Sequence, residues 1–141
     1  MISIDDIFRL AEGDKAAFEA AALELFRFQA AACPPYREYL DRIGVRQEAV
    51  GSLRQIPFLP IELFKSHEVY CCAEPPEAVF TSSATTGMIP SRHPMRSLAL
   101  YERAFRGAFR TFYGEPSQWS LYALLPNYLR RKGSSLVYMA D

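Results

Sequence analysis

The stretch AVFTSSATTGMIPSRHPM, residues 78–95, says most about the fold of this chain. Its first residues, including Val79 and Phe80, are typical of a core strand. Five Ser and Thr residues then lie between Phe80 and Gly87. A strand that leads through a hydroxyl-rich loop into a helix is a common phosphate-binding arrangement, because hydroxyls, exposed amides and a helix N-terminus attract anions. The residues therefore predict a strand, a phosphate-holding loop and a helix.

Other residues of the loop agree with this interpretation. Gly87 can adopt a positive φ and let the backbone approach a ligand. Arg92 would add a fixed positive charge with a bidentate fork, and His93 would donate a further hydrogen bond. The spacing matches neither GxxxxGK[ST] nor the three-glycine dinucleotide fingerprint. A solvated surface loop of turn-forming residues explains the same composition, so both interpretations stay open from the residues alone.

Helical and strand patterns alternate along the rest of the chain. An apolar segment interrupted by two prolines, residues 52–69, is expected to be irregular and buried. The aromatic stripe of the helix after the loop is expected to belong to the core. Helices are expected over residues 14–33, 36–43, 97–113 and 136–140, and strands over residues 68–72, 77–82 and 119–126.

This order predicts an α/β fold in which N-terminal helices precede a partly parallel sheet with flanking helices. We expect residues 1–50 to form a helical segment and residues 51–141 to form a partial α/β nucleotide-binding subdomain. The last helix has little to pack against within the chain. The sequence therefore predicts a fragment of a longer protein, or a chain that completes its core as a homo-oligomer.

Composition excludes several classes of function. Half of the 141 residues are apolar and 13% are aromatic, which is typical of a globular domain. Acidic and basic residues number 16 each, so charge gives no reason to expect nucleic acid as a partner. No apolar run approaches the ~20 residues of a membrane span, and MISIDDIFRL lacks a secretory signal pattern. Cys33, Cys71 and Cys72 form neither a disulfide framework nor a metal-site pattern. We expect a cytoplasmic protein.

The motif FTSSATTGMIPSRH, residues 80–93, resembles the phosphate-binding loop of the adenylate-forming, acyl-CoA synthetase-like superfamily. It is more closely similar to the loop of LuxE-type acyl-protein synthetases, which reads FTSSGTTG followed by PSRH. Three more stretches resemble the same branch: IPFLPIELFKSH (56–67), LALYERAFRGAF (98–109) and LLPNYLRRKGSSLVYM (124–139). Family members are more than twice as long, so the resemblance implies a fragment of the large domain of such an enzyme.

The resemblance implies an ATP-dependent ligase that uses ATP and Mg²⁺. Such an enzyme converts a carboxylic acid, for instance a fatty acid, into an acyl-adenylate and passes the acyl group to a thiol of a protein or of coenzyme A. It implies that Arg92 and His93 are catalytic and that no residue of this chain is a metal ligand. It also implies the following phosphate-binding residues: Thr81, Ser82, Ser83, Thr85, Thr86 and Gly87.

Two features of the sequence limit this expectation. Ala84 stands where the family usually has Gly, which would strain the loop by roughly 1 kcal/mol if that position requires a positive φ. The adenine pocket and the mobile lid of the family lie in segments that this chain does not contain, so the chain alone is expected to be inactive. The alternative is a non-catalytic interaction or scaffold domain that keeps the loop only as structure.

Overall fold

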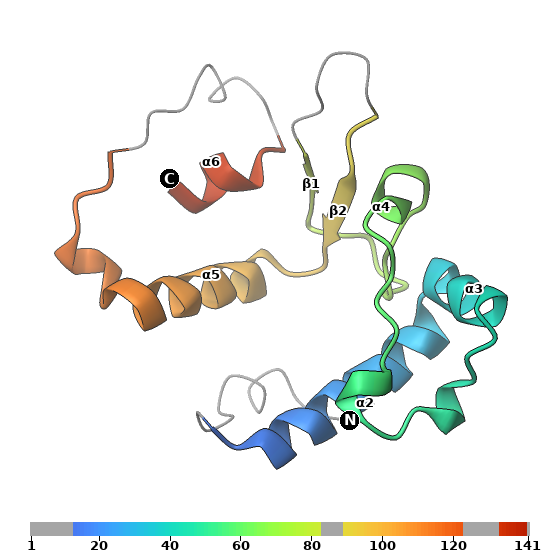
Figure 1. Ribbon diagram of the computed structural model, residues 1–141. Helices are drawn as coiled ribbons and strands as arrows, with labels where there is room; N and C mark the ends of the chain where they lie inside the picture. The colour runs from blue at the N-terminus through green and yellow to red at the C-terminus, as the bar shows by residue number, and fades with distance from the viewer. Residues whose placement is uncertain (1–12, 83–88, 123–132, 141) are drawn as a thin grey trace. The chain divides into compact units, whose positions relative to one another are not determined.

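The computed structural model describes residues 13–82, 89–122 and 133–140 (Figure 1). The chain divides into two compact units. The first unit comprises Met1–Leu63 and Val69–Cys71, and the second unit comprises Phe64–Glu68 and Cys72–Asp141. Within the described ranges, no helix combines the length and the apolar content that crossing a membrane requires.

The first unit is built on two consecutive helices, α2 (Lys15–Ala32) and α3 (Pro34–Arg42). Asp14 caps α2 as expected, since its Oδ1 accepts a hydrogen bond of 2.9 Å from the Ala17 amide. The second helix starts at Pro34, two residues before the expected start, because proline is well tolerated in the first turn, where its missing N–H has no intrahelical partner.

Glycine ends α3 as the sequence predicts. Gly44 has a φ of 71°, which is the left-handed conformation common just after a helix. Its amide donates to the Asp41 carbonyl and the Val45 amide donates to the Leu40 carbonyl, at 3.1 and 3.0 Å. This pair of bonds is the Schellman motif, which satisfies carbonyls that the helix leaves open.

The core of the first unit lies between these helices and the chain that follows them. Phe26, which is 2% exposed, meets Tyr36 edge-on at a ring distance of 6.1 Å. The short turns η1 (Gln47–Ala49) and η2 (Leu53–Gln55) follow. The buried cluster contains Phe26, Ala30, Cys33, Tyr36, Leu40 and Val50.

The proline-rich segment 52–69 is irregular, but it is less buried than expected. Its only regular pieces are η2 and the single turn α4 (Leu63–Ser66). Phe58 and Ile61 are 81% and 71% exposed. The prolines next to them lack an amide donor, so the backbone there is not drawn into a helix or a ladder that would turn these side chains inward.

The second unit contains an antiparallel hairpin of β1 (Ala78–Thr81) and β2 (Arg92–Met95). The fold therefore mixes helices with a small sheet, but the parallel pairing that we expected is not found among the described residues. The reason is the length of the connection. Residues 82–91 are enough for a hairpin loop, whereas a parallel pair needs a crossover of a dozen residues or more.

Two other expected strands do not form in the described part of the chain. Residues 68–72 have no regular structure, and neither have residues 119–122. The rest of the expected strand over 119–126 lies outside the described residues. The outer edge of β1 is bonded to a glycine instead, since the Thr81 amide donates to the Gly133 carbonyl at 2.8 Å.

Helix α5 (Leu98–Tyr113), the turn η3 (Pro116–Gln118) and helix α6 (Ser135–Ala140) complete the second unit. Phe80 of β1 contacts Tyr101 of α5 and Tyr138 of α6, with ring distances of 5.2 and 5.4 Å. The expectation that the aromatic stripe of α5 belongs to the core is met only in part, because Tyr101, Phe105 and Phe109 are half-buried and no residue of the helix is fully buried. Phe112 is 80% exposed, because the rings that pack on β1 and α6 come from the first turns of the helix.

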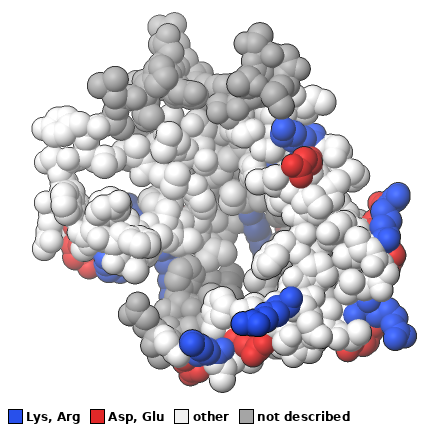
Figure 2. Space-filling model, in the orientation of Figure 1, with Lys and Arg blue, Asp and Glu red and all other residues white. Residues whose placement is uncertain are grey.

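Positive and negative side chains are interspersed in the space-filling view. Lys and Arg side chains lie next to Asp and Glu side chains on the face that Figure 2 shows. This distribution agrees with the balanced formal charge of the sequence.

Candidate functional site

Thr81 and Arg92 stand opposite each other where the hairpin opens into its loop. They are Cα partners in the register of the two strands, so their side chains share one face of the hairpin. Thr81 is half-buried and Arg92 is exposed. The structure thus places a hydroxyl and a guanidinium together at the mouth of the loop formed by residues 82–91.

A pair of serines closes the base of the loop. The Ser82 amide donates to the Ser91 carbonyl at 3.1 Å, and the Ser91 amide donates to Ser82 Oγ at 3.0 Å. Ser82 Oγ therefore accepts one bond from the base of the loop, and a serine hydroxyl can also donate one. Ser91 is 7% exposed, which makes it a structural residue of the base and not part of the open face.

His93 lies on the other face of the hairpin from Arg92. Strand alternation places it with its register partner Phe80. Its Nε2 lies 2.9 Å from Ser91 Oγ, and its ring stacks on Phe64 at a centroid distance of 5.1 Å. The structure therefore separates the two residues that the sequence proposed as catalytic, with Arg92 outward and His93 packed.

The helix that follows the hairpin begins away from the loop. The register pairs Met95 with Ala78, so the start of α5 lies at the opposite end of the hairpin. Its first amides are already bonded: Leu98 N–H donates to Glu77 Oε2 at 2.7 Å and Leu100 N–H donates to Ser97 Oγ at 3.2 Å. The expectation that the loop runs directly into a helix is wrong, because strand β2 intervenes.

Gly133 fixes the outer edge of β1 beside Thr81. Its φ is 97°, and a Cβ at this position would lie 3.4 Å from the Val79 carbonyl oxygen and 3.5 Å from Thr81 Oγ1. Both distances are ordinary van der Waals contacts, so glycine is favoured here by its backbone conformation and not by lack of space. Ser134 follows and caps α6, with its Oγ accepting from the Val137 amide at 3.4 Å.

The described part of the site thus consists of Thr81, Ser82, Arg92 and His93. The other expected ligands, Ser83, Thr85, Thr86 and Gly87, lie outside the described residues. Sequence reasoning missed Ser91 and Gly133. The period-two spacing of Ser91 and His93 was a signal for the first, and the glycine just before the Ser134 cap was a signal for the second.

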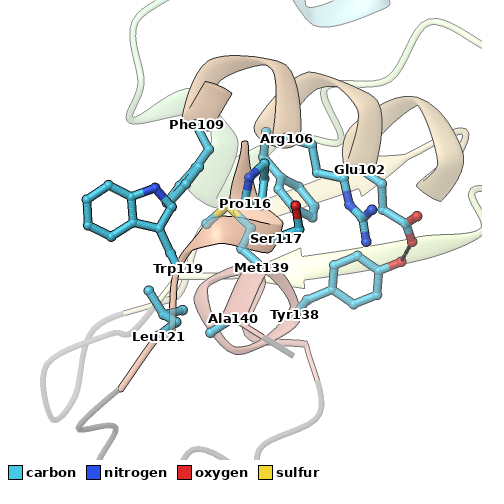
Figure 3. Close-up of a pocket in the computed structure, with 11 residues that line it drawn as sticks. Glu102, Arg106, Phe109, Pro116, Ser117, Trp119, Leu121, Tyr138, Met139 and Ala140 are labelled. Atoms are coloured by element: carbon cyan, nitrogen blue, oxygen red, sulfur yellow. Dashed lines mark hydrogen bonds between the residues drawn. The ribbon is translucent and has the colours of Figure 1, made fainter. Parts of the chain in front are cut away.

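A pocket of about 630 Å³ lies elsewhere in the second unit (Figure 3). It is lined by Glu102, Phe105, Arg106, Phe109, Pro116, Ser117, Trp119, Leu121, Tyr138, Met139 and Ala140. The Tyr138 hydroxyl donates to Glu102 Oε1 at 2.6 Å, and this hydrogen bond is the main cause that raises the pKa of Tyr138. The phenol therefore stays a donor across the physiological range.

Comparison of the chain with protein-family models, with curated proteins and with solved structures found no match. The candidate site therefore depends on the residues and their geometry.

Proposed function

We propose that this chain is the N-terminal part of an ATP-dependent acyl-activating ligase. In this proposal the hairpin loop holds the phosphates of ATP while a carboxylic acid is converted to an acyl-adenylate. The acyl group then passes to a thiol of a protein or of coenzyme A. The observation that carries the proposal is the placement of Thr81 and Arg92 on one face, at the mouth of a hydroxyl-rich loop.

The chemistry of adenylation suits these side chains. A carboxylate oxygen attacks the α-phosphorus of ATP, a new C–O–P bond forms, and pyrophosphate leaves with the electron pair of the broken P–O bond. The carboxylate is already a nucleophile, so the barrier comes mainly from crowded negative charge. Arg92 would neutralise phosphate charge with a fixed guanidinium, and the Thr81 hydroxyl would donate a hydrogen bond.

His93 supports the loop indirectly in this proposal. Its bond to Ser91 and its stacking on Phe64 hold the base of the loop from the packed face. Ser82, bonded to Ser91 on both its amide and its hydroxyl, links this base to the first loop position. His93 is then a positioning residue, while Arg92 is the residue that touches phosphate.

The proposal includes the finer fold expectation from the sequence. The hairpin and α5 would belong to a fragment of the large domain of an adenylate-forming enzyme, whose partly parallel sheet extends beyond the described strands. The resemblance of four separate blocks in the same order supports this view.

Magnesium would enter this site with the nucleotide. The described residues contain no group of three or more His, Cys, Asp or Glu side chains that converge as metal ligands. Mg²⁺ is commonly held by substrate phosphates, waters and only one or two carboxylates, and in this proposal ATP carries the ion. When bound, the ion would neutralise phosphate charge.

Isothermal titration calorimetry of the 141-residue chain with ATP and Mg²⁺ tests the proposal. We expect measurable binding, and we expect Arg92→Ala to weaken it by about tenfold or more, the effect of one charge-assisted hydrogen bond. Arg96→Ala is the matched control, because it removes the same charge from the opposite end of the hairpin, next to Met95. Absence of ATP binding, or an equal effect of both variants, would contradict the loop assignment.

A second candidate function is a non-catalytic interaction domain. It is favoured by the exposure of large apolar side chains, among which Tyr122 is 94% exposed. On this hypothesis the chain associates with a second copy of itself and does not bind ATP. Sedimentation velocity over a range of concentrations, together with the ATP titration, distinguishes the two functions. A chain that stays monomeric and binds ATP would exclude the interaction domain.

A further inference from the structure

The pocket between α5, η3 and α6 is lined by none of the described residues of the hairpin, and it has the properties of a ligand site. Its volume of about 630 Å³ lies in the range of small-molecule pockets, about 300–1,000 Å³. Apolar and aromatic side chains form most of its lining, and Phe109, Trp119 and Met139 come from three different segments. A few polar groups on a mainly apolar wall are typical of sites that bind and orient an amphipathic molecule.

The polar groups of this pocket carry opposite charges. Glu102 and Arg106 are four positions apart on α5, which places them on the same side of the helix within reach of one small molecule. Tyr138 donates to the Glu102 carboxylate and so holds it in one orientation (Figure 3). Among the residues that the structure describes, Arg106 forms no ion pair or hydrogen bond, so its donors are open to a ligand.

We propose that this pocket binds a small zwitterion with an apolar body, of which an aromatic α-amino acid is the simplest example. The ligand's carboxylate would pair with Arg106 and its ammonium group with Glu102, while its apolar body would contact Phe109 and Trp119. A simple anion would be repelled by Glu102 and a simple cation by Arg106. Only a ligand with both charges satisfies both side chains. The proposal does not depend on the ATP site.

The position of Trp119 gives a direct test, because it is the only tryptophan of the chain and it lines the pocket. The intact chain is titrated, without ATP, with L-phenylalanine, 3-phenylpropionate and phenethylamine, with tryptophan fluorescence as the readout. We expect L-phenylalanine to bind at millimolar concentration or better. Each probe that lacks one charge is expected to bind at least about tenfold more weakly, the effect of one charge-assisted hydrogen bond.

Two substitutions assign the charges. Arg106→Gln should weaken the binding of L-phenylalanine about tenfold but leave the binding of phenethylamine unchanged or improved. Glu102→Gln should also weaken the binding of L-phenylalanine about tenfold but leave the binding of 3-phenylpropionate unchanged or improved. Arg103→Gln removes a positive charge from the same helix outside the pocket lining and serves as the control. Equal binding of all three probes, no fluorescence change with L-phenylalanine, or an equal effect of Arg103→Gln and Arg106→Gln would overturn the proposal. Failure of the ATP titration would leave it intact.

Discussion

Two residues that the sequence analysis did not propose as ligands, Ser91 and Gly133, bond to the two ends of the hairpin loop. Ser91 connects the Ser82 backbone and side chain to the imidazole of His93 through three polar contacts. The Gly133 carbonyl accepts a hydrogen bond from the Thr81 amide, and its φ of 97° is a conformation that residues with a Cβ rarely adopt. Both act on the loop through the residues at its ends, so their effects on stability can be measured without a ligand.

Gly133→Ala should lower the free energy of unfolding by about 1–2 kcal/mol, because a φ of 97° is unfavourable for a residue with a Cβ. Denaturant unfolding measures this change. Gly107→Ala is the control, since Gly107 lies inside α5 and a Cβ there meets nothing within 4 Å. It should stabilise the chain by about 0.5–1 kcal/mol through helix propensity. The same sign for both substitutions would contradict the description of Gly133.

Ser91→Ala should cost about 1–3 kcal/mol, since it leaves the His93 Nε2 atom without its partner in a half-buried position. Urea unfolding of the variant gives the value. Ser120→Ala removes an exposed hydroxyl in the same unit and should change stability by less than about 0.5 kcal/mol. A neutral effect of Ser91→Ala would mean that the contact with His93 does not hold the loop base.

The hairpin and the long helices differ in how far sequence alone could predict them. Helices α2 and α5 carry their own signals, since Asp14 and Ser97 cap them and Gly114 ends the second. The strand β2 has no such signal, because Arg, His and Pro are poor strand formers and form a strand only by pairing with β1. Sequence therefore predicted the helices and β1, and missed the element that separates the loop from α5.

The site was predictable to the same extent. The sequence and its resemblance proposed Thr81 and Arg92 as site residues, and only the register shows that they share a face while His93 lies on the other. A contact such as that between Thr81 and Gly133 joins residues far apart in sequence, and no local pattern specifies it. Local chemistry was thus visible in the sequence, and non-local pairing was not.

A buried phenol links helix α3 to the proline-rich segment. Burial raises the pKa of Tyr36 above its ordinary value of 10.0, and its hydroxyl donates to the Pro57 carbonyl. A pKa that is higher in the folded state contributes stability below about pH 10, and this contribution is lost as the pH rises through the folded value. The protein should therefore lose stability in alkaline solution.

Tyr36→Phe tests this link. At neutral pH the variant should be about 1 kcal/mol less stable, because the bond to Pro57 is lost. Above pH 10 the difference should shrink, because the phenol of Tyr36 ionises more readily in the unfolded wild type than in the folded wild type, and this ionisation favours unfolding. The Phe variant has no such group to ionise. Thermal unfolding followed by circular dichroism over an alkaline pH series gives both values. A constant difference across the series would contradict the burial of this phenol.

The division of the chain into two compact units predicts that damage to one core stays local. Phe26→Ala in the first unit should cost about 3–5 kcal/mol, because Phe26 is 2% exposed. Amide hydrogen exchange should then accelerate in α2 and α3 and remain unchanged in α5. Phe112→Ala, at an 80% exposed position, is the control and should change amide exchange in neither unit. Equal acceleration in both units would show that they unfold as one.

The single residue between α2 and α3 has a consequence for chemistry in solution. Cys33 is the whole linker, its thiol is among the most enclosed side chains of the first unit, and its backbone bonds to both helices. A thiol-specific reagent can reach that sulfur only when the helix pair separates. The rate of Cys33 labelling therefore reports how often the first unit opens, and no engineered probe is needed to measure it.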